Sequence, residues 1–190
     1  MKFLVGLILT LTIITPFFEH SEADTQLLAD VMWLENGSTG YTTEDNKQCL
    51  ILTGAVVLNR ARSGEWGGTS IYDVIYAKGQ YAYETKKNIG KCKTPQYVVD
   101  LAEEILTYGT NVPDYVVYQS TQKNLGTVWK IIEYKPNEYF ATDGGHYMEG
   151  KDFVVKTNKE QYEEQVRQSI RKIIRQWNKS LNKLLKKLQP

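Results

Sequence analysis

The chain has 190 residues with a formal net charge of +1 at pH 7, a length that supports a single domain with a sizeable core. The balanced charge gives no indication of a nucleic-acid partner. Only one histidine, His146, follows the leader segment predicted below, which excludes a zinc peptidase or amidase site with two or three histidine ligands.

The N-terminal residues 1–23 are predicted to form a secretory signal peptide. Lys2 is followed by an apolar run, Phe3–Phe18, and then by the small residues Ser21 and Ala23, an order typical of such leaders. The run is shorter than the ~20 residues that a spanning helix needs, although an uncleaved anchor is the alternative. We expect cleavage near Ala23 and a secreted protein.

Two predicted helices follow the leader, joined by a polar, glycine-containing connection. The first covers Leu27 to Asn36, because the Asn36-Gly37 pair is typical of a helix stop. The second covers Gln48 to Arg60 and is apolar on nearly every face, which predicts the buried axis of the core. Glu44 lies just before it and is interpreted as an acid in the first turn of that helix.

Glu35, at the end of the first predicted helix, is the candidate for a catalytic acid. The last turn of a helix carries unpaired carbonyl groups and the negative end of the helix dipole, which disfavour a carboxylate. Apolar neighbours such as Trp33 and Leu34 add a desolvation effect of the same sign. Both effects raise the pKa of Glu35 and keep it protonated near neutral pH, as a general acid requires. The alternative is an ordinary exposed glutamate.

The middle of the chain predicts two more helices. Ser70 is followed by an acid three residues on, which indicates a short helix that ends near Gly79. An extended segment, Gln80–Tyr83, and a lysine-rich loop come next. Pro95 then opens a helix that carries apolar residues on one face and stops at Gly109.

A small β region is predicted after Asp114. The short strands Tyr115–Tyr118 and Tyr139–Ala141 are rich in aromatic and β-branched residues, and the glycine-rich turn Asp143–Tyr147 presents His146. The fold class is therefore α+β, mostly helical. We divide the chain into the leader, a domain over residues 24–157 and a C-terminal helix over residues 158–190.

The C-terminal helix is predicted to be amphipathic. Its apolar residues fall at helical spacing, and every charged residue beyond Glu164 is Lys or Arg. One interpretation is a helix that lies on an anionic membrane. The alternatives are a stripe that packs back on the domain and a coiled segment that binds a partner.

The two cysteines, Cys49 and Cys92, both follow the leader. An even number of cysteines in a secreted chain indicates a possible disulfide, which here would close a long loop onto the core helix. The alternative is that Cys49 is a buried thiol of the core.

Short motifs occur in a fixed order along these segments: Leu34-Glu35, Ala55–Arg60, Ser70–Tyr76, Gly79-Gln80-Tyr81, Tyr115–Tyr118 and Gly144-Gly145-His146. In this order they resemble the SleB-type cell wall hydrolases, the family that includes spore-cortex-lytic enzymes. The resemblance runs from about Leu27 to Tyr147.

The resemblance implies a lysozyme-like domain that cleaves the β-1,4 bond between N-acetylmuramic acid and N-acetylglucosamine as a lytic transglycosylase. Glu35 would protonate the glycosidic oxygen, and its carboxylate would then deprotonate the muramoyl 6-hydroxyl. Four further residues would line the sugar groove: Gln80, Tyr81, Tyr118 and His146. A hydrolase would need a second carboxylate, for which the candidates are Glu44, Glu84 and Asp143.

The partner implied is the peptidoglycan glycan strand, with possible contact of the C-terminal helix to an anionic membrane or a wall polymer. No cofactor, metal or nucleic acid is expected, and the location is secreted or cell-wall associated. Two other readings stay open. Cys92 and His146 could serve a cysteine-dependent peptidoglycan amidase or endopeptidase, or the protein could bind the wall without catalysis.

Overall fold

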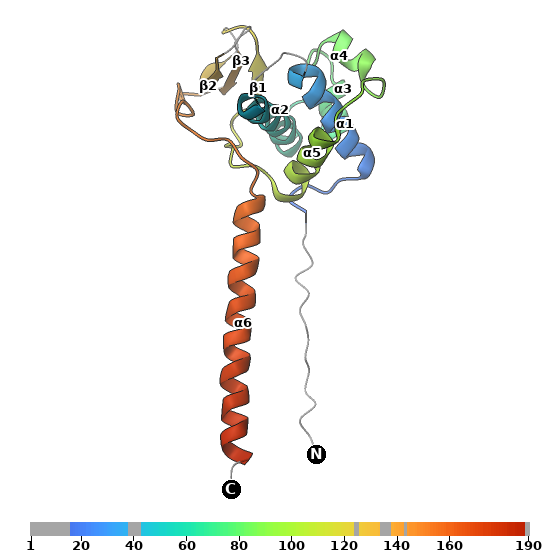
Figure 1. Cartoon of the computed structure of the whole chain (residues 1–190). Helices are drawn as coiled ribbons and strands as arrows, with labels where there is room; N and C mark the ends of the chain where they lie inside the picture. The colour runs from blue at the N-terminus through green and yellow to red at the C-terminus, as the bar shows by residue number, and fades with distance from the viewer. Residues whose placement is uncertain (1–15, 38–42, 124–125, 134–137, 143, 189–190) are drawn as a thin grey trace.

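The structure is a computed structural model of the chain (Figure 1). Its described residues are 16–37, 43–123, 126–133, 138–142 and 144–188, and of residues 43–46 and 183–188 only the backbone is described.

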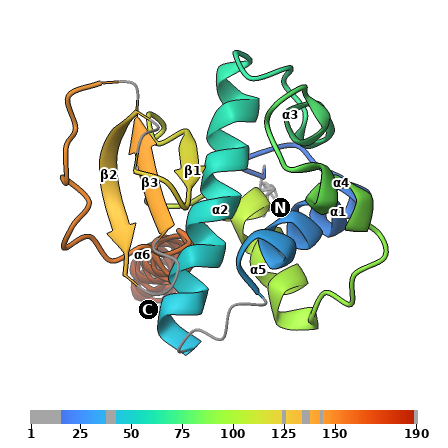
Figure 2. The same ribbon diagram turned by 90° about the horizontal axis from the view of Figure 1, so that it is seen from above.

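Helix α2 (Thr43–Ser63) is the axis of the molecule, as its apolar sequence predicts. Seen from above, it lies between the sheet on one side and the other helices of the domain on the other side (Figure 2). Its residues from Cys49 to Leu52 and from Ala55 to Leu58 are all at most 1% exposed. Gly54 allows α5 (Gln96–Tyr108) to approach, because an added Cβ would lie 2.7 Å from Ile105 Cδ1.

Helix α1 (Glu22–Met32) begins earlier than predicted. Ser21 is its N-cap: its hydroxyl accepts a hydrogen bond from the Asp24 backbone at 3.3 Å, and the Asp24 carboxylate accepts one from the Ser21 backbone at 2.9 Å. The segment before α1 lies against the end of α5, because the backbone N–H groups of Phe17 and Phe18 donate hydrogen bonds to the carbonyls of residues 107 and 106. The predicted cleavage point at Ala23 therefore falls inside α1.

The end of this first helical segment also differs from the prediction. After Met32 the chain continues as one π-helical turn, η1 (Trp33–Gly37), instead of an α-helix that runs to Asn36. Asn36 is fully buried, and its side-chain amide donates to the hydroxyl of Thr53 on α2. This contact fixes the π-turn against the core helix.

The next helices are α3 (Ile71–Tyr76), α4 (Tyr83–Asn88) and α5 (Gln96–Tyr108). Ser70 caps α3 as predicted, through a bond from the Asp73 backbone at 3.0 Å. The predicted extended segment Gln80–Tyr83 is a turn, and α4 begins at its last residue and continues into the predicted loop. Pro95 at the start of α5 and Gly109 at its end, with φ +73°, confirm the predicted bounds of that helix.

The sheet has three antiparallel strands in the order β1-β3-β2, namely β1 (Tyr118–Ser120), β2 (Thr127–Ile132) and β3 (Glu138–Thr142). The α+β class is confirmed, but β2 was not predicted. Its Lys130 is only 6% exposed, and the ammonium group donates to three backbone carbonyls, of Gly150, Lys151 and Phe153. Burial lowers the pKa of Lys130.

Helix α6 (Lys159–Leu188) extends from the domain like a stalk (Figure 1). Its base is held by the Lys159–Glu104 ion pair at 2.7 Å and by the Tyr108 and Tyr162 rings, whose centroids are 5.4 Å apart. Within the described part of the chain, no helix has the length and apolar character to cross a membrane.

The predicted disulfide is not formed. Cys49 and Cys92 are not joined, because Cys49 is fully buried in α2 whereas the Cys92 thiol lies 3.3 Å from the Thr94 hydroxyl, in the loop before α5. That loop is fixed to α1 by Asp30, whose carboxylate accepts hydrogen bonds from the Thr94 hydroxyl and the Gly90 backbone.

Candidate active site

Glu35 lies in the π-turn η1, half-buried between α1 and α4. The Thr85 hydroxyl of α4 donates a hydrogen bond of 2.7 Å to its carboxylate. Burial raises the pKa of Glu35, and the Thr85 hydrogen bond partly offsets this effect. The predicted direction of the shift is thus confirmed, with burial as its main cause. One-turn π segments are frequent at functional sites.

A second carboxyl group, Glu138, interacts with Glu35. Glu138 is the first residue of β3 and is only 5% exposed, because strand alternation places it on the same face as the buried Phe140. Burial, followed by the negative charge of Glu35, raises the pKa of Glu138 to about 7, against a weaker lowering by a hydrogen bond with Gln119. Two acids that affect each other in this way titrate as a pair.

Glu138 was missed by the sequence reasoning, which began this strand one residue later, at Tyr139. In a strand every second side chain points to the same face, so the apolar Phe140 indicates that Glu138, two residues earlier, also points inward. This pattern is the signal that could have placed Glu138 on the inner face.

Gln119 connects the two sides of the site. It lies on β1, opposite Phe140 of β3, and its amide nitrogen is 3.5 Å from the side-chain oxygen of Asn36. The Gln119 side-chain oxygen is buried and has no hydrogen-bond partner among the described residues. A buried acceptor of this kind is available to a donor on a ligand.

Tyr81, in the turn between α3 and α4, also lies next to the carboxyl pair. Its hydroxyl is buried and has no hydrogen-bond partner within the described residues. Burial raises the pKa of Tyr81 to about 12; the nearby Arg60 lowers it, and the negative charge of Glu35 raises it further. The Arg60 guanidinium is 5.8 Å from the Tyr81 ring centroid, and its Nε donates to the Val117 carbonyl at 2.7 Å.

An aromatic wall continues from Tyr81 through Arg60 to Trp66 and Tyr118. The guanidinium of Arg60 is 5.0 Å from the Trp66 ring, and the Trp66 and Tyr118 rings meet edge to face at 5.1 Å. Trp66 was missed because it lies in a segment that the sequence predicts only as a loop. The predicted Gln80 is half-buried in the turn just before Tyr81.

His146 lies further along the same surface. Its ring stacks on Tyr115 at 4.0 Å, and its Nδ1 is 3.0 Å from the Glu149 carboxylate. His146 and Trp66 both line a shallow pocket of ≈ 290 Å³. The structure therefore connects His146 to the aromatic wall, and its stacking and hydrogen-bonding partners, Tyr115 and Glu149, are separate from the carboxyl pair.

The three predicted candidates for a second acid have different outcomes. Glu84 is exposed on α4 and pairs with Lys87 at 3.7 Å. Glu44 lies in the first turn of α2, but its side chain is outside the described residues, as is the whole of Asp143. Glu138 is thus the described carboxyl group that interacts with Glu35.

The thiol of Cys92 is not prepared for nucleophilic attack. Its pKa is raised, first by burial and then by the charge of Asp30, which is the opposite of what a thiolate nucleophile needs. Its neighbours Thr94 and Asp30 belong to the α1–α5 side of the domain, whereas those of His146 belong to the sheet side. Among the described residues, no cluster of three or more His, Cys, Asp or Glu side chains could hold a metal ion.

A family model described as Cell Wall Hydrolase matches residues 44–147. This range contains α2, the aromatic wall, Glu138 and His146, and Glu35 lies ahead of it. No curated protein and no solved structure matches the chain.

Proposed function

Because the chain belongs to the cell wall hydrolase family, whose model matches more than half of its residues, we propose that it cleaves the β-1,4 glycosidic bond between N-acetylmuramic acid and N-acetylglucosamine. Peptidoglycan is the substrate that the family implies. The observation that favours a glycosidase is the carboxyl pair beside the aromatic wall, in which Glu35 is half-buried and Glu138 is buried. Glycosidic bonds are typically cleaved by carboxyl groups whose pKa values are set by such an environment.

Glu35 is the proton donor in this proposal. Its raised pKa keeps the carboxyl group protonated closer to neutral pH than an exposed glutamate. In the first step the proton moves to the glycosidic oxygen, the bond from that oxygen to the muramoyl C1 breaks, and positive charge develops on the sugar ring. The resulting Glu35 carboxylate lies beside that charge and stabilises it.

The second step is proposed to be a transglycosylation. The Glu35 carboxylate takes the proton of the muramoyl 6-hydroxyl while that oxygen bonds to C1, which closes the anhydro ring and restores the acid. Burial and the charge of the Glu35 carboxylate raise the pKa of Glu138 to about 7, so Glu138 keeps its proton in slightly acidic solution once Glu35 has given up its own. It is then neutral and acts neither as a nucleophile nor as a base, which leaves a single working carboxylate.

The aromatic wall is proposed to hold the glycan strand. Sugar rings present C–H groups that pack on aromatic faces, and their hydroxyl and acetamido groups need hydrogen-bond partners. Tyr81, Trp66 and Tyr118 supply the rings, and the buried oxygens of Tyr81 and Gln119 supply unused hydrogen-bonding capacity. His146 would contact the strand further along the groove.

We also propose that the protein is exported to reach the wall, with the N-terminal apolar run as its leader. The structure favours cleavage ahead of Pro16 over the predicted point near Ala23. Cleavage at Ala23 would remove Ser21, which caps α1, and the two backbone hydrogen bonds that Phe17 and Phe18 donate to α5.

The test is an analysis of products from purified peptidoglycan by mass spectrometry, with three proteins. These are the wild type, Glu35→Gln, and Glu84→Gln as a matched control, since Glu84 is exposed and only pairs with Lys87. We expect anhydromuramoyl fragments from the wild type and the control, and a loss of about 1,000-fold or more in Glu35→Gln.

Other products would change or overturn the proposal. Fragments with reducing ends would mean hydrolysis and would assign the second carboxylate to Glu138. Cleaved peptide stems, or activity that a thiol alkylator abolishes, would favour the cysteine-dependent amidase. No products from the wild type would leave a wall-binding protein.

A further inference from the structure

Among the described residues, helix α6 contacts the domain through its first turns. Asn158 joins its base to the end of α5, with its backbone N–H donating to the Gly109 carbonyl and its side-chain amide to the Thr110 carbonyl. The Lys159–Glu104 ion pair and the Tyr162 ring, which is tilted by 42° against the Tyr108 ring, complete this base. All described side chains from Arg167 to Asn182 are exposed. With 30 residues the helix is about 45 Å long, so most of its length has no partner within the described chain.

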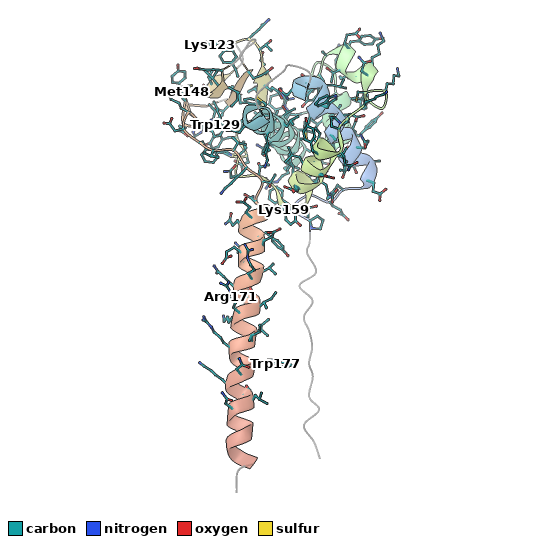
Figure 3. The ribbon with its side chains drawn as sticks, viewed as in Figure 1. Lys123, Trp129, Met148, Lys159, Arg171 and Trp177 are labelled. Atoms are coloured by element: carbon teal, nitrogen blue, oxygen red, sulfur yellow. The ribbon has the colours of Figure 1, made fainter. Side chains whose placement is uncertain are left out.

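The free part of α6 has two chemically different faces. Its large apolar side chains, here named the α6 stripe, are each between 51% and 59% exposed: Ile170, Ile173, Ile174, Trp177 and Leu181. At 100° per residue they fall within an arc of about 100°. Cations occupy the other side of the helix: Arg171, Lys172, Arg175 and Lys179. Figure 3 shows Arg171 and Trp177 on the stalk, far from the domain.

The charge of α6 decides what can cover the stripe. From Gln165 to Pro190 the sequence has eight Lys or Arg and no Asp or Glu. A second copy of the helix would add the same positive charges without any compensating acid. An anionic lipid surface attracts each Lys and Arg close to it, and it also accepts the apolar side chains, with Trp preferring the boundary between lipid and water.

The position of α6 in the fold agrees with this choice. Phe17 packs over Gly109 at the end of α5, so the described chain begins at the same end of the domain as α6. Helix α1 starts there and runs away from it (Figure 1), and Glu35 follows in η1, beyond the C-terminal end of α1. A surface bound at the α6 end leaves the candidate active site unobstructed.

We propose that α6 is a membrane-binding arm, which lies in the surface of an anionic lipid bilayer with its stripe in the lipid and its cations toward the headgroups and water. This inference goes beyond the proposed glycosidase, since it needs no catalytic step. It makes a bilayer, and not the wall polymer, the surface to which the C-terminal helix binds.

The test is co-sedimentation of the full chain with vesicles, either of phosphatidylcholine alone or of equal parts of phosphatidylcholine and phosphatidylglycerol. Two matched variants are compared, Ile174→Gln in the stripe and Asn182→Gln on the polar side, since both place glutamine at an exposed α6 position. We expect binding to the mixed vesicles to exceed binding to the neutral ones by about tenfold or more. Ile174→Gln should lower it by about tenfold, and Asn182→Gln should leave it unchanged.

A spectroscopic measurement locates the contact. The tryptophan emission of the wild type should shift to shorter wavelength on mixed vesicles, and Trp177→Phe should lose this shift because Trp177 is the tryptophan of the stripe. Equal helicity of all variants by circular dichroism, and equal activity on soluble glycan fragments, separate loss of binding from loss of folding.

Three results would overturn the proposal. The first is equal binding to neutral and anionic vesicles. The second is vesicle binding that the stripe variant does not weaken, which would assign it to the N-terminal run. The third is a dimer by light scattering that Ile174→Gln dissociates without any vesicle binding. Binding to purified wall in place of vesicles would likewise assign the helix to the polymer.

Discussion

Replacement of Glu138 by glutamine should change how the stability of the fold depends on pH. The pKa of Glu138 is about 7 in the folded protein, against 4.5 for the unfolded chain. A folded-state pKa above the unfolded value means that the folded state holds the proton more tightly. Between about pH 4.5 and 7 the unfolded chain loses this proton and the folded protein keeps it, so the free energy of unfolding decreases as the pH rises through this window.

The size of the effect follows from the two pKa values. Their difference, 7 minus 4.5, corresponds to at most about 3.5 kcal/mol at ~1.4 kcal/mol per pKa unit. Because Glu138 is only 5% exposed, solvent screens little of this penalty. Glutamine has no proton to lose, so Glu138→Gln should match the wild type near pH 4 and be more stable by up to about 3 kcal/mol near pH 8.

The assay is urea unfolding of the wild type and Glu138→Gln at about pH 4, 6 and 8, with the midpoint compared at constant m value. Glu133→Gln is the control, since Glu133 is an exposed glutamate just after β2. Parallel pH profiles for the wild type and Glu138→Gln would refute the reasoning, and so would an equal gain in the Glu133 variant.

Three further substitutions or truncations test other parts of the structure. Thr85→Val removes the hydrogen bond that lowers the pKa of Glu35, so the pKa of Glu35 should rise. The alkaline limb of the pH–rate profile should then move to higher pH, while kcat should change by less than about tenfold. A chain that begins at Asp24 lacks the α1 cap, so its thermal unfolding midpoint should lie about 5 °C below that of a chain that begins at Pro16. Scanning calorimetry measures this difference, and equal midpoints would show that residues 16–23 do not stabilise the fold. Lys130→Met leaves three carbonyls without their donor and should cost about 2 kcal/mol in chemical denaturation, and an unchanged midpoint would contradict this role.

Local signals were sufficient for most of the helices. Ser70 at the start of α3, and Pro95 and Gly109 at the ends of α5, act through neighbouring backbone groups, so the sequence contains their whole effect. The continuous apolar character of α2 likewise predicted its central position. Glu35 could be found because a helix end and apolar neighbours are also local features.

The parts that were missed depend on contacts between distant segments. Strand β2 contains Lys130, which looks like a surface residue until the carbonyls of the loop after β3 surround its ammonium group. Glu138 becomes part of the site only because β3 packs its inner face toward Glu35. The π-turn is likewise fixed by Thr53 and Gln119, which belong to other elements.

The carboxyl pair also has a consequence for the order of events during folding. It joins the π-turn that follows α1 to the first residue of β3, two segments far apart along the chain. Contacts of such high sequence separation form late, because closing the intervening loop costs entropy before the contact is made. A newly made chain can therefore reach most of its helical content while the pair is still separated. The proposed cleavage of the glycan would begin only when the sheet docks, so a partly folded chain would leave the polymer around it intact.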